Sequence, residues 1–155
     1  PALIYACYRK LEKTTLEMIN QDADLNVKMP GNVTLLIYAC SSGMIAVVTE
    51  LLKRSVDVNE ESEYHISPLI EAARRQHEDI FIKLVDHGAD ITDGVMNYAR
   101  ENSNLLTYIN NLKQRYRDAI LHVMSDSVTP NNKMYESFAT TYVPQLVGII
   151  CDFII

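Results

Sequence analysis

The side chains in this 155-residue sequence that are best suited to metal binding or nucleophilic catalysis are four histidines and three cysteines. Metal binding or nucleophilic catalysis needs such groups clustered at short, regular spacing. No histidine stands within four residues of a cysteine, and the odd number of cysteines shows no paired spacing that predicts a disulfide framework or a zinc site. The five glycines form no phosphate-binding motif. We therefore predict no enzyme, no catalytic residues, no metal, no cofactor and no small-molecule substrate.

Charge argues against a nucleic-acid partner, and the length of the apolar runs argues against a membrane span. The net charge is −6, and the most basic run, "LKQRYRD" at 112–118, is closed by Asp118 and is typical of a solvated helix face. We therefore expect no nucleic-acid partner. No apolar run reaches the ~18 residues that a membrane span needs, and no signal peptide opens the sequence. We expect an intracellular, cytoplasmic protein with reduced thiols.

The elements that carry these residues repeat along the chain. "LIYAC" occurs at 3–7 and again at 36–40, and rows of 33 residues align Leu3 with Leu36 and Leu69. Each row ends alike, in "DADLN", "SVDVN" and "GADIT". A strict period of this length indicates a solenoid, in which each unit buries its apolar face against the next.

Each row contains two short amphipathic helices. Leu36, Ala39 and Cys40 fall on one face of the first helix, and the second buries an apolar stripe that begins at Val47. Thr34 and Ser67 precede the first helices and are good N-caps. Gly43 is a good C-cap, and the loop residues Asp24, Asp57 and Asp90 are expected to bond the local backbone.

The rows resemble ankyrin repeats. "TLLIYACSSGMIAVVTELLKRSVDVN" and "SPLIEAARRQHEDIFIKLVDHGADIT" follow that family's pattern, in which His77 matches a consensus histidine. The resemblance implies an all-α fold, an ankyrin-repeat solenoid of helix-turn-helix units with short hairpin turns, closed by C-terminal helices. Its repeats are 1–27 (partial), 28–60, 61–93 and 94–111 (degenerate). The first row begins inside a repeat, so we expect further repeats upstream in a longer parent protein.

Two departures from the ankyrin pattern have structural consequences. Asn32 and His65 replace the glycine of the turn, and both residue types tolerate a positive φ. Cys7 and Cys40 occupy equivalent positions in stacked helices, which lie about 8–10 Å apart. A disulfide needs Cα atoms within about 7 Å, so we expect two free structural thiols.

The period fails after Gly94. "VMNYAR" predicts a shortened inner helix with Ala99 in the small-residue position, without a preceding hairpin. Apolar residues at helical spacing from Leu105 to Met124 then predict one long helix over 104–125. We assign residues 1–111 to the repeats and 112–155 to a helical C-terminal cap or extension.

A different interpretation of the last segment remains open. "VPQLVGIICDFI" resembles the opening helix of an F-box, although the rest of an F-box is absent and a leucine replaces the usual glutamate. The resemblance implies a substrate adaptor that recruits the SKP subunit of a cullin ubiquitin ligase. The repeats also resemble those of giant DNA viruses and amoeba-dwelling bacteria, which implies a host-pathogen interaction in the host cytoplasm. The matching F-box positions are Val143, Pro144, Leu146, Val147, Ile150 and Phe153.

The resemblance to ankyrin repeats also implies where a partner binds. In that family a protein partner contacts the hairpin tips and the exposed side of the inner helices, and tyrosine and arginine are common anchors of interfaces. We therefore predict a monomeric protein-binding module, with a structural spacer in a longer array as the alternative. The predicted contact residues are Tyr5, Tyr8, Arg9, Tyr38, Ser41, Ser42, Glu71, Arg74 and Arg75 on the helices and Met29, Pro30, Val33, Glu63, Tyr64 and Ile66 at the tips.

Overall fold

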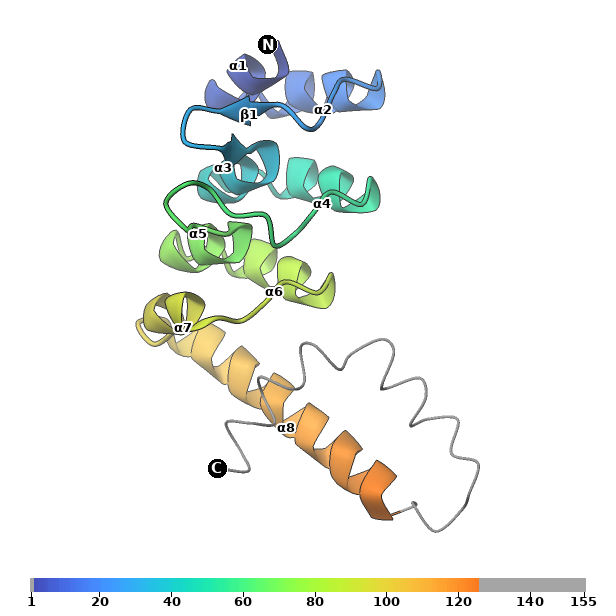
Figure 1. Cartoon of the computed structure of the whole chain (residues 1–155), viewed down its shortest axis with the longest axis vertical. Helices are drawn as coiled ribbons and strands as arrows, with labels where there is room; N and C mark the ends of the chain where they lie inside the picture. Colours follow the sequence, from blue (N-terminus) through green and yellow to red (C-terminus); the bar gives the residue numbers. More distant parts are fainter. Residues whose placement is uncertain (1, 126–155) are drawn as a thin grey trace. The chain divides into compact units, whose positions relative to one another are not determined.

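The structure is a computed structural model that describes residues 2–125 (Figure 1). The chain divides into two units, 1–105 and 106–155. The first unit contains seven short helices and one small hairpin of β1 (Lys28–Met29) and β2 (Val33–Thr34). The helices are α1 (Ala2–Tyr8), α2 (Glu12–Asn20), α3 (Leu35–Ser42), α4 (Ile45–Lys53), α5 (Pro68–Arg74), α6 (Glu78–Asp86) and α7 (Asp93–Ala99).

The long helix α8 (Ser103–Ser125) begins in the first unit and continues into the second. It matches the helix predicted over 104–125 to within one residue. Its start is held within the first unit by Glu78 of α6, because Asn102 Nδ2 and Asn104 Nδ2 donate to Glu78 Oε1 at 3.1 and 3.0 Å. Leu105 is buried in its first turn.

The helices of the first unit form two parallel rows. The inner helices α1, α3, α5 and α7 stack on one another, and the outer helices α2, α4 and α6 stack beside them (Figure 1). The antiparallel pair β1–β2 and the loop before α5 lie on the side of the inner helices (Figure 1). The all-α solenoid of helix pairs with short turns, predicted from the 33-residue period, is confirmed.

The helix ends follow from the residue types that the sequence places there. Thr34 Oγ1 accepts from the Ile37 N–H at 3.2 Å, and Ser67 Oγ accepts from the Ile70 N–H at 3.2 Å, so both predicted N-caps are confirmed. Pro68 occupies the first turn of α5, where its missing N–H removes no helical bond. Gly43 ends α3 in the left-handed conformation with φ of 74°.

The two predicted turns form despite their missing glycines. Asn32 and His65 both adopt φ of 55°, as expected for residues that take the glycine's place. The first turn is flanked by β1 and β2, whereas the second closes through the Ser62 N–H, which donates to the Ile66 carbonyl at 3.1 Å. No strand is assigned between α6 and α7, as the shortened fourth row predicts.

The core lies between the two rows of helices. Ala39 and Cys40 of α3 and Val47, Val48 and Leu51 of α4 are all fully buried, which confirms the predicted apolar stripes. Ala99 of α7 is also fully buried, in the small-residue position predicted for it. Small side chains at these positions let successive inner helices approach closely, so each pair covers the next.

Polar groups link one repeat to the next at the loops. Asp24 Oδ1 and Asp57 Oδ1 accept from the N–H groups of Asn26 and Asn59, each at 2.9 Å, as expected for loop aspartates. Asn59 then reaches the following repeat, because its Oδ1 accepts from the Asp90 N–H at 2.9 Å. Its Nδ2 also donates to a backbone carbonyl of that repeat at 3.3 Å.

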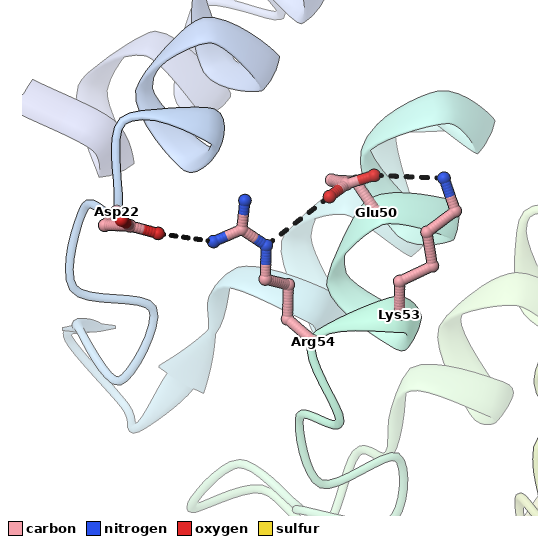
Figure 2. Close-up of polar contacts among 4 residues, drawn as sticks. All are labelled: Asp22, Glu50, Lys53 and Arg54. Carbon is pink, nitrogen blue, oxygen red and sulfur yellow. Dashed lines mark hydrogen bonds and ion pairs between the residues drawn. The ribbon is translucent and has the colours of Figure 1, made fainter.

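A charged network joins the ends of two outer helices (Figure 2). Arg54, which follows α4, donates to Asp22, which follows α2, at 2.8 Å, and it also pairs with Glu50 at 3.4 Å. Lys53 pairs with Glu50 at 3.2 Å. The hydrogen bond from Lys53, with the neighbouring Arg54, holds the pKa of the Glu50 carboxyl below its ordinary value. The hydrogen bond to Asp22, aided by Glu50, raises the pKa of Arg54, so the network favours charged side chains at this repeat junction.

The two cysteines of the inner helices generate a test of the core. Cys7 and Cys40 are free and fully buried, as predicted. Burial raises the pKa of Cys7 to about 12. Burial, and then the charge of Glu71 and the neighbouring Cys7, raise the pKa of Cys40 further. In a Cys151→Ser variant at pH 8, we expect a chromogenic disulfide reagent to label both thiols only as the protein unfolds.

The same shifts fix the direction of a pH effect on stability. Below the ordinary thiol pKa of 9.0 both the folded and unfolded states hold the proton, so the thiols leave stability unchanged. Between pH 9 and about 12 the unfolded state ionises first, and stability falls as pH rises. In the labelling experiment, reaction of the disulfide reagent with the folded protein as fast as with free cysteine would contradict the burial of Cys7 and Cys40.

Candidate functional site

The predicted contact residues of the repeats gather on one side of the first unit. They lie on α1, α3 and α5 and on the turns beside them (Figure 1). We call this surface, formed by the 15 predicted contact residues, the inner face. Tyr5, Tyr8 and Tyr64 are strongly exposed, at 60%, 58% and 72%. Exposed with them are Arg9, Pro30, Glu63, Arg74 and Arg75, while Met29, Val33, Tyr38, Ser41, Ser42 and Ile66 are half-buried.

Aromatic side chains connect the first two inner helices. The rings of Tyr8 on α1 and Tyr38 on α3 lie 6.1 Å apart between centroids, with their planes tilted by 37°. The Tyr38 hydroxyl donates to the Tyr8 carbonyl at 3.3 Å. The guanidinium of Arg9, directly after α1, lies 5.8 Å from the Tyr5 ring centroid and donates to the Tyr5 hydroxyl at 3.3 Å. These contacts fix the side chains in place while leaving Tyr5 and Tyr8 open to a partner.

The tips of the two turns contact each other. The Glu63 N–H donates to the Gly31 carbonyl at 2.9 Å, and the Tyr64 ring lies against Gly31. A Cβ at Gly31, where φ is 81°, would lie 3.0 Å from Tyr64 Cε2. Gly31 therefore positions Tyr64, a role that the sequence prediction missed because the contact joins residues 33 positions apart.

The prediction that Glu71 is an exposed contact residue is wrong. Only 5% of Glu71 is exposed, and its carboxylate pairs with the arginines three and four positions later in the chain. Arg74 Nη2 donates to Glu71 Oε1, and Arg75 Nε lies 3.7 Å from Glu71 Oε2. The two arginine side chains stay 40% and 52% exposed. Glu71 therefore holds two exposed guanidinium groups and does not itself meet a partner.

The histidines of the repeats occupy structural positions. The His77 ring packs on Gly43, where a Cβ would lie 2.9 Å from His77 Cε1. His65 pairs with Glu61 at 3.2 Å at the exposed turn, and His87 Nδ1 lies 2.8 Å from the Lys83 carbonyl at the end of α6. Within residues 2–119 no three metal-ligating side chains converge, and within the described part of the chain no helix is long and apolar enough to cross a membrane.

The F-box-like positions Val143, Pro144, Leu146, Val147, Ile150 and Phe153 lie outside the described residues. The predicted cap over 112–155 likewise lies mostly outside them. The adaptor and cap interpretations of this segment therefore stay predictions.

The regular stack of helix pairs at a 33-residue period defines a helical repeat protein. A family profile described as "Ankyrin repeats (3 copies)" matches residues 3–94, so the chain belongs to the ankyrin-repeat family. The fold is similar to the crystal structure of the human ASB11 ankyrin repeat domain, with a TM-score of 0.55 and 19% identity. That match covers 67% of this chain and 55% of the other chain. A search of curated proteins found no significant match.

The buried carboxylate gives a prediction about the two arginines. Replacing Arg74 with alanine leaves the Glu71 carboxylate buried with one ion-pair partner, whereas Glu71→Gln leaves arginines that water can solvate. We expect Arg74→Ala to cost about 1–3 kcal/mol of unfolding free energy, more than Glu71→Gln, in urea titrations. Arg100→Ala, on the exposed end of α7, serves as the control. Equal losses for all three variants would contradict a buried, paired Glu71.

Proposed function

We propose that this chain is a protein–protein interaction module whose partner binds the inner face. Ankyrin repeats are generally modules of this kind, and they are typically not enzymes. The observation that carries the proposal is the distribution of exposed aromatic groups. Among the residues that the structure describes, Tyr5, Tyr8 and Tyr64 are strongly exposed and Tyr98 is 38% exposed, and all four lie on inner helices or a turn tip.

Tyrosine suits an interface because its ring offers apolar area and its hydroxyl a hydrogen bond at low entropic cost. On the outer row the large exposed apolar side chains are Leu11 and Ile45, near the starts of α2 and α4, with no exposed aromatic ring within the described residues. This asymmetry favours a binding module over a spacer, because a spacer gains nothing from aromatic rings on one face. A monomer in a reducing cytoplasm is part of the proposal.

The test is a pulldown with matched surface variants of the full chain. The double variant Tyr8→Ser/Tyr64→Ser removes the two rings with high exposure on separate repeats, and Leu11→Ser removes a comparably exposed side chain from the outer row. We expect proteins captured by the unchanged chain to be lost at least tenfold with the double variant and retained with Leu11→Ser. Thermal melting should show all three folded. Capture that survives the double variant would refute binding at the inner face.

The sequence supports a second candidate function, that of a substrate adaptor for a cullin-type ubiquitin ligase. Its basis is the match of "VPQLVGIICDFI" to the opening helix of an F-box. In this proposal the repeats hold the substrate and the C-terminal segment recruits the SKP adaptor. The proposal is consistent with a protein acting in a host cell, as the resemblance of the repeats to viral and bacterial arrays implies.

Phe153→Ala distinguishes an adaptor segment from a cap. We expect the segment to be a cap. Phe153→Ala then removes a buried phenylalanine and lowers the free energy of unfolding by about 3–5 kcal/mol, as measured by urea titration. We also expect no capture of purified SKP adaptor by the unchanged chain. An adaptor segment would give the opposite pair of results: nearly unchanged stability, with adaptor capture that Phe153→Ala abolishes.

A further inference from the structure

We infer that the inner face takes an extended acidic peptide segment, with two carboxylate side chains about six residues apart and an apolar side chain between them. The inference rests on the proposed function, because it names the chemistry of the partner at the same face. It follows from the separation of charge between the inner helices and the rest of the repeats, and from the spacing of the basic groups.

The segments of the first three inner helices carry charge of the opposite sign to that of the whole chain, whereas the fourth inner helix, α7, begins with the exposed Asp93. Segments 2–10, 35–43 and 68–76 contain four basic side chains, Arg9, Lys10, Arg74 and Arg75, and one acidic side chain, Glu71, which is buried. The whole chain has a net charge of −6, and within residues 2–119 most acidic side chains lie on the outer helices and the loops. Every exposed charge of these three segments is therefore positive. The negatively charged remainder of the chain repels an acidic partner, so such a partner is directed to these segments.

The basic groups lie at two ends of the surface with aromatic rings between them. Arg9 directly follows α1, Arg74 ends α5 and Arg75 follows it. The Tyr8–Tyr38 pair joins α1 to α3. Stacked helices lie 8–10 Å apart, so two steps of the stack place these ends about 16–20 Å apart. An extended chain rises about 3.3 Å per residue and spans that distance in about six residues.

The arginine pair is prepared for an incoming carboxylate. Glu71 pairs with both guanidinium groups from beneath, which limits the side-chain freedom that binding otherwise removes. At the other end Arg9 is fixed over the Tyr5 ring, and within the described residues no carboxylate pairs with it. Both ends therefore present donors that a peptide carboxylate satisfies with charge-assisted hydrogen bonds.

A nucleic acid fits this surface less well than an acidic peptide. Its backbone carries closely spaced charges along its whole length and binds best to a continuous basic groove. Here the basic groups sit at two separated ends, and the exposed Glu61 and Glu63 lie on the turn before α5. Two isolated carboxylates match the pattern better.

The test is selection of a random 12-residue peptide library, displayed on phage, against the full chain. We expect selected peptides to carry two acidic residues about six positions apart with an apolar residue between. A synthetic representative is then measured by fluorescence anisotropy with variants of the chain. Arg9→Glu should weaken binding about tenfold and Arg75→Gln several-fold, while Lys13→Glu, an equal charge change on α2, should change it less than twofold.

The peptide and solution conditions provide the controls. Replacing the two acidic residues with their amides should remove binding, and raising NaCl from 0.05 to 0.5 M should weaken it. The inference would be overturned if acidic peptides bound the Arg9→Glu variant with unchanged affinity or if oligothymidine displaced them. It would also be overturned if the selected peptides had no acidic residues. Peptides of the last kind that lose binding on Tyr8→Ser/Tyr64→Ser would leave the proposed function standing. Selection of no peptide would overturn the inference, and the pulldown with Tyr8→Ser/Tyr64→Ser would decide the proposed function separately.

Discussion

The repeats depend on one constraint: no helix pair of about 17 ordered helical residues covers its own apolar side. The stripe of Val47, Val48 and Leu51 and the face of Ala39 and Cys40 become dry only where a neighbouring pair lies against them. Alanines at equivalent positions of the inner helices keep the spacing short enough for that contact. Stability therefore comes from interfaces between pairs as much as from the pairs themselves.

This constraint separates the roles of the two sides of each inner helix. Residues that face the next pair are chosen by packing, and residues on the opposite side are free to differ from repeat to repeat. The first repeat has Tyr5, Tyr8 and Arg9 there, whereas the third has a glutamate that lies under two arginines. One scaffold thus presents two tyrosines with Arg9 at one end and an arginine pair at the other, without any change in its core.

Much of the fold was predictable because a 33-residue period with two amphipathic segments in each row indicates a solenoid of helix pairs. Local chemistry also predicted particular details correctly: the caps at Thr34 and Ser67, and the positive φ at Asn32 and His65. The site was predictable only as a face. The burial of Glu71, the packing of Tyr64 on Gly31 and the bridge from Arg54 to Asp22 all depend on which side chains meet in three dimensions. Residue types and spacing within one repeat do not determine those side-chain contacts.

The turns carry a further mechanical consequence. Lys10, Asp22, Asn32, Ser55, His65 and Gln76 all adopt positive φ without being glycine. Such a residue raises the energy of the folded backbone by about 1–2 kcal/mol for ordinary side chains, and by less for asparagine. These residues sit at the joints between helices, never inside them. Lys10 and Gln76 join the two helices of one pair, whereas Asp22 and Ser55 follow outer helices. At each of these positions the backbone cost persists only because the packing around it holds the chain in that conformation.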